Sequence, residues 1–340
     1  MYRDEQRICI LGAGSWGTAL ARLLGSKEYK VTLWDRNQHI TGHIAQHGHN
    51  PRYLPDVALG DAVSATSVMK DALAEANWVI VAVASDGVRD VLGEAVDYVG
   101  ENAVVISACK GLEADTGMTI SDIIESVFSD ISYAGLCVLS GPNLAGELAQ
   151  GIPSASVVAS LDPQVARAAQ ELLMTDRTFR VYTHDDTRGV ELGGALKNVL
   201  AIGAGISDGL GFGDNTKAAL MTRGLMEMTQ LGVATGGKAV TFLGLSGVGD
   251  LMATATSRLS RNYRVGLGLA QGKALTEVLA DLHQAAEGVP TARAAQVLST
   301  RLKVEVPVFS TLYEVVHEGK SPLHAVESLM CRDARSEFGE

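Results

Sequence analysis

A glycine-rich turn near the start of the chain constrains the fold more than any other feature. Apolar residues 8–11 run directly into the sequence G-A-G-S-W-G at residues 12–17, and an apolar helical pattern follows. The order strand, G-x-G-x-x-G, helix is typical of the first unit of a dinucleotide-binding sheet. The glycines permit a tight turn and close backbone approach to a pyrophosphate, and the helix N-terminus adds partial positive charge. A glycine-rich turn with a purely structural role is the alternative.

The first half of the chain alternates short apolar runs with helical patterns. Several runs are continuously apolar, which is typical of strands covered on both faces. Repeated strand–helix–strand order implies right-handed crossovers and a doubly wound, mostly parallel sheet of the Rossmann-like α/β class. The predicted strands cover residues 7–11, 31–34, 78–83, 104–108, 136–139, 156–159 and 179–183.

The second half shows helical periodicity and almost no strand pattern. Pro307 and Pro322 stand at natural first-turn positions of helices. We therefore predict a dinucleotide-binding domain over residues 1–187 and an all-helical substrate domain over residues 188–340. The two should share a firm interface, because no flexible linker separates them. The predicted helices cover residues 188–206, 216–232, 261–271, 276–286, 291–301, 308–318 and 322–330.

The composition narrows the possible partners and the compartment. Lys and Arg number 28 against 39 Asp and Glu, a net charge of −11, which argues against nucleic acid but permits a locally basic pocket for an anionic substrate. The four cysteines lack ligand spacing, so we expect free thiols, three of them buried. A charged start without a signal peptide, and no apolar run of the ~18–20 residues that span a bilayer, predict a cytoplasmic protein without membrane insertion.

The end of the second predicted strand bears on cofactor choice. An acidic residue there accepts hydrogen bonds from the ribose 2′-OH of NAD, whereas an arginine accommodates the 2′-phosphate of NADP. This chain has both, as Asp35 and Arg36. We expect NADP(H) with NAD(H) tolerated. Stacking of Arg36 on the adenine, or a solvated Arg36, remain alternatives.

Four histidines lie in the crossover after that strand. The pairs His39/His43 and His43/His47 have i, i+4 spacing, and His49 follows. No carboxylate pattern supplies a third ligand, as metal sites usually require. We therefore expect solvated histidines and no metal.

Several longer segments form a pattern that resembles a known family. They are S-A-C-K-G-L-E at 107–113, L-S-G-P-N-L-A-G-E at 139–147, the stretches 191–223 and 245–266, and A-E-G-V at 286–289. With the glycine loop they resemble the bacterial-type NAD(P)-dependent glycerol-3-phosphate dehydrogenases, from about residue 7 to residue 330.

The resemblance implies the reaction and its setting. Members of the family interconvert sn-glycerol 3-phosphate and dihydroxyacetone phosphate by hydride transfer with NAD(P)H, which supplies glycerophospholipid synthesis, and a homodimer is expected. The chain departs from the pattern at three positions. Trp16 stands where other aromatic residues occur, Cys109 is an unusual residue before Lys110, and Asn143 stands where Ser or Thr is common. These departures concern the shape of the pocket rather than the reaction, because none removes a charged group.

Lys197 is the predicted proton donor. Ketone reduction needs a positioned nicotinamide, a proton donor and stabilisation of the developing alkoxide. Lysine donates well only when desolvation or a nearby cation lowers its pKa. Lys197 has Ala201, Ala204 and Gly205 on its helix face, which leaves little water around the ammonium. The resemblance implies a general acid/base role, and a lysine on an exposed helix face is the alternative.

Three further residues are predicted around Lys197. Lys110 follows a strand at its carboxyl end, where ligands bind in open α/β sheets, so it could polarise the carbonyl and lower the pKa of Lys197; an exposed loop lysine is the alternative. Asp250 could cap a helix or, by resemblance, bind substrate and orient Lys197. Asn198 could bind substrate or nicotinamide, or be a helix-surface amide.

Ser260, Arg261 and Asn262 stand at the start of a predicted helix and form a candidate phosphate cradle. A capping serine beside a solvated arginine is the alternative. Together, motif and resemblance predict a substrate set of Lys110, Gly141, Asn143, Lys197, Asp250, Ser260, Arg261 and Asn262. The predicted cofactor set is Gly12, Gly14, Ser15, Trp16, Gly17, Arg36, Lys110, Ala145, Arg261 and Glu287.

Two other functions compete with this interpretation. A sister two-domain dehydrogenase of a β-hydroxy acid or a sugar acid phosphate would need a further cation for the substrate carboxylate, and the matched motifs contain one phosphate cradle. A non-catalytic NAD(P)-binding sensor would lack the catalytic lysines, and Lys110 and Lys197 are both present.

Overall fold

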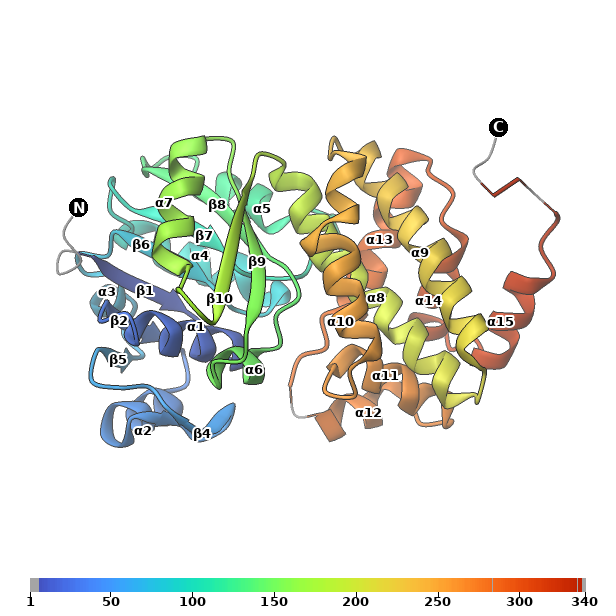
Figure 1. Ribbon diagram of the computed structural model, residues 1–340, viewed down its shortest axis with the longest axis horizontal. Coiled ribbons are helices and arrows are strands. Elements are labelled where there is room, and N and C mark those ends of the chain that lie inside the picture. Colours follow the sequence, from blue (N-terminus) through green and yellow to red (C-terminus); the bar gives the residue numbers. More distant parts are fainter. Residues whose placement is uncertain (1–5, 283, 335, 338–340) are drawn as a thin grey trace.

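The structure is a computed structural model that describes residues 6–282, 284–334 and 336–337. Figure 1 shows two parts side by side, a sheet flanked by helices and a bundle of helices. The last strand, β10 (Phe179–His184), is followed closely by the first bundle helix, α8 (Thr187–Gly209). The chain therefore passes from sheet to bundle through a short connection.

The sheet has eight strands in the order β10-β9-β8-β7-β6-β1-β2-β5. All neighbours are parallel except β8 and β9, which are antiparallel. The carboxyl ends of β1, β6 and β7 are in register, with Leu11 beside Val81 and Val81 beside Ser107. The predicted mostly parallel sheet is confirmed. The strands other than β10 are β1 (Arg7–Leu11), β2 (Lys30–Trp34), β5 (Val63–Thr66), β6 (Trp78–Val81), β7 (Val104–Ser107), β8 (Gly135–Ser140) and β9 (Ser154–Ala159).

Three strands were not predicted from the sequence. The edge strand β5 has the sequence V-S-A-T, too short and polar to form an apolar run, and it pairs only with β2. The hairpin of β3 (His49–Asn50) and β4 (Leu54–Ala58) lies outside the main sheet. All three lie at an edge or outside the sheet, so they lack the two-sided burial that marks the central strands.

Helices cover both faces of the sheet (Figure 1). One core contains Leu20 of the first helix with Ile10 of β1, and the core of the opposite face contains Ile123 with Val79 of β6. Local caps define several helix starts, such as the reciprocal Thr119 and Asp122 bonds. The helices are α1 (Ser15–Gly25), α2 (Gln38–His47), α3 (Met69–Leu73), α4 (Val88–Ala95), α5 (Ile120–Val127), α6 (Ala145–Ala149) and α7 (Pro163–Leu173).

Helix α8 is the centre of the second part. Its residues from Gly189 to Ser207 are all buried, so this helix is covered on every side. It packs against α11 very closely, because a Cβ at Gly205 would overlap the Tyr263 carbonyl and a Cβ at Gly266 would overlap that of Ile202. The other bundle helices are α9 (Asp214–Ala234), α10 (Asp250–Thr256), α11 (Arg261–Ala270), α12 (Leu275–Leu282), α13 (Gly288–Leu302), α14 (Pro307–His317) and α15 (Pro322–Met330).

One bundle helix was not predicted, and another was predicted too long. The helix α10 was missing from the predicted set, since it is short and follows a glycine-rich π-helical segment, Leu245–Gly249. The predicted helix at residues 276–286 ends early, at Leu282. Beyond it, Gln284 and Glu287 contact Ser15 and Ser85 of the sheet domain. Gln284, which the sequence places in a helix, thus contacts the sheet domain instead.

The cysteines and histidines are placed as follows. Cys9, Cys109 and Cys137 are buried and Cys331 is exposed, all as free thiols, which confirms the expectation for three buried thiols. The Nε2 atoms of His43 and His49 lie 3.1 Å apart, and both side chains are half-buried, whereas His39 and His47 are exposed. Partial burial and neighbouring imidazoles lower the pKa of His43. Among the described residues, no group of three or more His, Cys, Asp or Glu side chains could hold a metal ion.

Candidate active site

The glycine loop lies at the carboxyl end of β1, where Gly12 adopts a φ of +112° and its N–H donates to the Trp34 carbonyl. Ser15 is the first residue of α1, and within the described chain no side chain caps this helix. The space around Gly14 is open, since a Cβ there would meet no atom within 4 Å. Free N–H groups and open space fit a dinucleotide pyrophosphate at this turn.

Asp35 and Arg36 take different positions. The Asp35 carboxylate accepts hydrogen bonds from the backbone N–H groups of Ala13 (3.0 Å) and Asn37 (2.9 Å), so it is held against the glycine loop. Arg36 is exposed. Asn50 also supports the loop by donating to the Ala13 carbonyl at 2.8 Å, a contact that the sequence analysis missed.

Two lysines share one buried carboxylate. The Nζ of Lys197 lies 2.9 Å from Oδ1 of Asp250, and the Nζ of Lys110 lies 2.8 Å from Oδ2 of the same residue. Lys197 is 5% exposed and Asp250 is 2% exposed. The exposed-lysine alternative is therefore wrong for both: α8 is buried, and the Lys110 side chain is only 15% exposed. Two ammonium groups and one carboxylate leave the cluster with one excess positive charge.

Asp250 is the first residue of α10 and makes no capping bond, so the helix-capping alternative is wrong. Its carboxylate instead accepts from the lysines and, at 3.2 Å, from the Thr254 hydroxyl. That hydroxyl also accepts from Lys197 Nζ at 2.5 Å. Thr254 was missed in the sequence, although its i+4 spacing from Asp250 could have indicated it.

Burial lowers the pKa of Lys197 to about 8. Asp250 opposes this effect, whereas the positive charge of Lys110 adds to it. The predicted influence of Lys110 thus has the expected sign, with burial as the larger cause. A lysine with this pKa exchanges a proton readily near neutral pH.

A chain of amides connects the site to three helices. The side chain of Asn198 donates to the Lys110 carbonyl (2.8 Å), and that of Asn262 donates to the Asn198 side-chain oxygen (2.8 Å). The Gly288 N–H then donates to Asn262 at 2.9 Å. Asn198 is therefore a connecting residue between domains rather than a surface amide. Both amides are buried and hydrogen-bonded, which fixes their orientation.

The candidate phosphate cradle begins α11. Ser260 is the N-cap and its hydroxyl accepts from the Tyr263 N–H, which bears out its capping role. Asn262 is turned inward to Asn198, and Arg261 is exposed with its charge near Glu287. The structure thus connects Asn262 to the lysine cluster through Asn198, keeps Ser260 as a helix cap, and leaves Arg261 exposed near Glu287.

The segment after β8 contributes backbone. The Gly141 carbonyl accepts from Lys110 Nζ at 2.6 Å, and the φ of Gly141 is +138°. The Asn143 side chain instead bonds to β9, donating to the Ala155 carbonyl (3.2 Å) and accepting from Ser156 (2.5 Å). Asn143 therefore anchors its loop in this structure. Ala145 begins α6, which packs against α1.

Trp16 and Glu287 face the site from opposite domains. The Lys110 Nζ lies 5.9 Å from the centroid of the Trp16 ring. The indole Nε1 is buried and has no hydrogen-bond partner among the described residues. Glu287 accepts from the backbone N–H (3.0 Å) and hydroxyl of Ser85, and burial raises its pKa. Ser85 and Gln284, which accepts from Ser15 at 3.3 Å, had no recognisable sequence signal.

Comparison with known proteins assigns both halves of the chain to one family. The profile of the NAD-dependent glycerol-3-phosphate dehydrogenase N-terminus matches residues 7–166, and that of the C-terminus matches residues 186–327. The glycerol-3-phosphate dehydrogenase (NAD(P)+) of Anaeromyxobacter dehalogenans is 46% identical over 332 residues, which cover 98% of this chain and 100% of the relative.

Solved structures agree with this assignment. The crystal structure of glycerol-3-phosphate dehydrogenase from Coxiella burnetii has a TM-score of 0.92 and 37% identity, covering 96% of this chain and 99% of that one. The enzyme from Saccharomyces cerevisiae has a TM-score of 0.80 and 26% identity, covering 95% and 98% of the two chains.

The fold, the glycine loop and the buried lysines define a two-domain oxidoreductase that uses a pyridine dinucleotide. More specifically, the chain belongs to the NAD-dependent glycerol-3-phosphate dehydrogenase family.

Proposed function

We propose that this chain interconverts sn-glycerol 3-phosphate and dihydroxyacetone phosphate, with Lys197 as the general acid and base. The observation that carries the proposal is the buried bridge Lys197–Asp250–Lys110 at the carboxyl end of β7. It combines a lysine whose pKa is about 8 with a second cation in one enclosed site, next to the loop that binds the dinucleotide.

Each group has a role in ketone reduction. The dinucleotide supplies the hydride when bound. The Lys197 ammonium gives its proton to the carbonyl oxygen, and the positive charge of Lys110 stabilises the negative charge that develops there. Asp250 holds both Nζ atoms in place, and Thr254 fixes the position of Lys197. In the oxidative direction the neutral Lys197 amine accepts the hydroxyl proton.

The substrate phosphate is assigned to the start of α11. Backbone N–H groups at a helix N-terminus and a guanidinium are both suited to bind a phosphate dianion. Ser260, Arg261 and Asn262 supply them, and Asn262 is one hydrogen bond from Asn198 on α8. Gly141 and Asn143 would complete the substrate pocket on the sheet side.

The cofactor is assigned to the glycine loop, with NADP(H) preferred and NAD(H) tolerated. Gly12, Gly14, Ser15 and Gly17 would receive the pyrophosphate, with Trp16, Lys110, Ala145, Arg261 and Glu287 around the nicotinamide side. The exposed Arg36 is available for a 2′-phosphate, whereas both oxygens of Asp35 already accept backbone bonds. These contacts favour Arg36 over Asp35 as the residue that binds the 2′ position of the ribose.

The relationship to the family supports a proposal for the cellular setting. We assign residues 1–187 to the dinucleotide-binding domain and residues 188–340 to the substrate domain. The enzyme would act in the cytoplasm, supply glycerophospholipid synthesis, and bind no nucleic acid. No helix among the described residues is long and apolar enough to cross a membrane.

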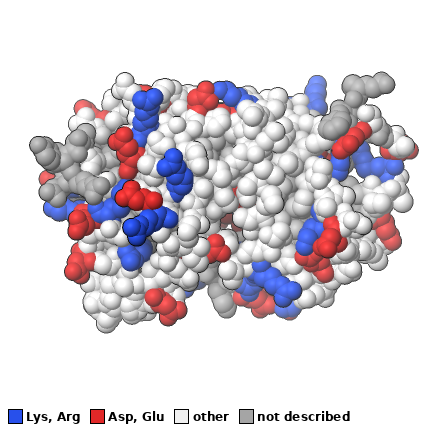
Figure 2. Space-filling model, in the orientation of Figure 1, with Lys and Arg blue, Asp and Glu red and all other residues white. Residues whose placement is uncertain are grey.

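A homodimer fits an uncharged band on one face. Figure 2 shows few charged side chains over the middle of this face, where α10 lies in Figure 1. Strand β10 lies beside this band and carries the exposed Arg180. Exposed apolar residues on these elements and their loops include Tyr182, Leu243, Met252 and Leu259. Strand β10 is also an edge of the sheet, and edges of this kind are available for pairing. Sedimentation analysis tests the dimer, and a monomer at micromolar concentration would contradict it.

The experiment that tests the reaction is a measurement of initial rates with dihydroxyacetone phosphate, with NADPH and NADH in parallel. Turnover with both, and a higher kcat/KM for NADPH, is expected. Normal cofactor binding without turnover would contradict the substrate assignment. Absence of cofactor binding by folded protein would contradict the dinucleotide site as well.

A further inference from the structure

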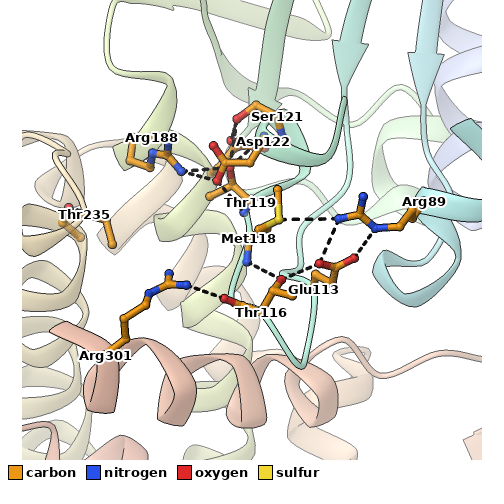
Figure 3. A network of polar contacts seen from close by, with 12 residues as sticks. Arg89, Glu113, Thr116, Met118, Thr119, Ser121, Asp122, Arg188, Thr235 and Arg301 are labelled. Carbon is orange, nitrogen blue, oxygen red and sulfur yellow. Dashed lines mark hydrogen bonds and ion pairs between the residues drawn. The ribbon is translucent and has the colours of Figure 1, made fainter. Parts of the chain in front are cut away.

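A pocket separate from the lysine cluster lies at the boundary between the two parts. The proposed reaction uses none of the residues that form it. Its volume is about 370 Å³, within the roughly 300–1,000 Å³ range of small-molecule sites, which occur preferentially at domain interfaces. Arg188 and Arg301 lie in its wall, together with Thr119, Thr235 and Asp122. Figure 3 shows these side chains around the loop that follows β7. The apolar part of the wall is formed by Met118, Leu192, Leu298 and Leu302.

The pocket has a local excess of positive charge. Of its three charged residues, Arg188 and Asp122 form an ion pair of 2.5 Å. Arg301 donates to the Thr116 carbonyl at 2.8 Å, and no carboxylate in the described part of the chain forms an ion pair with it. One positive charge thus remains in a chain with a net charge of −11.

The nearby acidic residues are bound elsewhere. Glu113 is held by Arg89, with contacts of 2.7 and 3.1 Å, and Asp115 pairs with Arg293 at 2.8 Å (Figure 3 for the first pair). The buried Glu191 accepts from the Ser121 N–H at 2.9 Å. None of these three carboxylates pairs with Arg301, so its guanidinium can bind an anion.

The wall belongs to elements that carry the lysines or adjoin the site. Arg188 is on α8, about two and a half turns before Lys197. Thr119 ends the loop that starts after Lys110, and Arg301 is in the last turn of α13, which begins at Gly288 beside Asn262. A molecule in the pocket would touch all three elements at once.

We propose that this pocket binds a small anionic molecule, a phosphate or carboxylate on a short apolar body, and that its occupancy alters turnover at the lysine cluster. The anion pairs with Arg301 and competes with Asp122 for Arg188, while the apolar body packs on Leu192 and Leu298. Charge-assisted bonds to guanidinium groups give such a site its selectivity for anions.

The test is isothermal titration with phenyl phosphate, with benzyl alcohol as the uncharged comparison. All variants carry Arg261→Ala, so that the proposed phosphate cradle does not contribute. Phenyl phosphate should bind this parent, and binding should weaken at least tenfold on adding Arg301→Gln. Benzyl alcohol should bind neither.

Two further variants define the place of binding. Ala234→Trp fills the pocket from an exposed wall position that makes no polar side-chain contact, and it should abolish binding. Arg293→Gln is the matched control: Arg293 is on the same helix, also contacts the loop, and does not line the pocket. It should leave the Kd unchanged. Thermal melting of each variant checks that it is folded.

Several outcomes would overturn the proposal. Failure of the Arg261→Ala parent to bind phenyl phosphate, or equal binding with and without Arg301→Gln and Ala234→Trp, excludes the site. Binding that changes kcat equally in the otherwise native enzyme and in Ala234→Trp excludes the coupling to turnover. The titration needs no turnover, so it remains decisive even if dihydroxyacetone phosphate proves not to be the substrate.

Discussion

The two parts of the molecule contribute to the site in different ways. The sheet domain offers mainly backbone: the contiguous loop from Gly12 to Gly17, and the Gly141 carbonyl that holds Lys110. The helical domain offers buried side chains, such as Lys197 and Asp250, from helices far apart in the sequence. A site made of backbone depends on the space that its glycines leave open, whereas a site made of side chains depends on charge and proton position. Substitutions in the two parts should therefore fail in different ways.

The largest effect is expected for Lys197→Ala. Loss of the proton donor should lower kcat about 10²–10⁴-fold, the usual contribution of general acid–base catalysis, with NADPH affinity little changed. Steady-state kinetics and fluorescence titration with NADPH measure the two. Lys273→Ala, which removes an exposed lysine paired with Asp281, is the control and should behave as the parent enzyme. Unchanged turnover in Lys197→Ala would show that Lys197 is not the proton donor.

A smaller effect with a distinctive pH signature is expected for Asp250→Asn. Lys197 must be protonated to reduce a ketone, so kcat in that direction should fall as pH rises through about 8. Asp250 raises the pKa of Lys197, so its neutralisation should move this fall to lower pH and reduce kcat roughly 10- to 100-fold. The pH profile of kcat is the measurement. The control Asp185→Asn, at an exposed ion pair, should leave the pH profile unchanged. An unchanged profile in Asp250→Asn would show that Asp250 does not set the pKa of Lys197.

Two glycine substitutions separate binding from folding in the sheet domain. A Cβ at Gly17 would overlap the Gly12 carbonyl, whereas a Cβ at Gly14 meets no atom within 4 Å. Gly17→Ala should lower Tm, and Gly14→Ala should keep Tm while weakening NADPH binding about tenfold, by occupying the space of the pyrophosphate. Thermal melting and NADPH titration decide this. Equal Tm losses would show that both glycines are structural.

An effect confined to one cofactor is expected for Arg36→Ala. Loss of one charge-assisted contact to a 2′-phosphate should raise the KM for NADPH about tenfold and leave that for NADH nearly unchanged. Parallel kinetics with both cofactors provide the ratio, with Arg52→Ala as a control at another exposed arginine. An equal loss for both cofactors would make Arg36 an adenine-stacking residue.

Periodicity was sufficient to predict the central strands and most bundle helices, because burial on both faces of the sheet leaves continuous apolar runs. It failed at β5 and in the β3–β4 hairpin, where burial is partial. It also failed at α10, which follows the glycine-rich π-helical segment Leu245–Gly249. Prediction from local sequence thus failed for the strands and the helix that depend on contacts with other parts of the fold.

The site shows the same division. Lys110, Lys197 and Asp250 were predicted, and the structure brings them together. Thr254, Ser85 and Gln284 were missed, because a single hydroxyl or amide has no pattern until its partner is known. Asn143 was predicted as a substrate contact, and its side chain bonds to β9 here.

The sequence by itself determined the dinucleotide loop, the class of fold and the identity of the charged groups, since these depend on local backbone geometry and on residue type. Only the tertiary structure decided that one carboxylate bridges two lysines, that burial lowers the pKa of Lys197, and that an arginine pocket lies at the domain boundary. The physical reason is that charge interactions and desolvation depend on distances through space. Those distances are set by how α8, α10 and α13 pack, and not by their order along the chain.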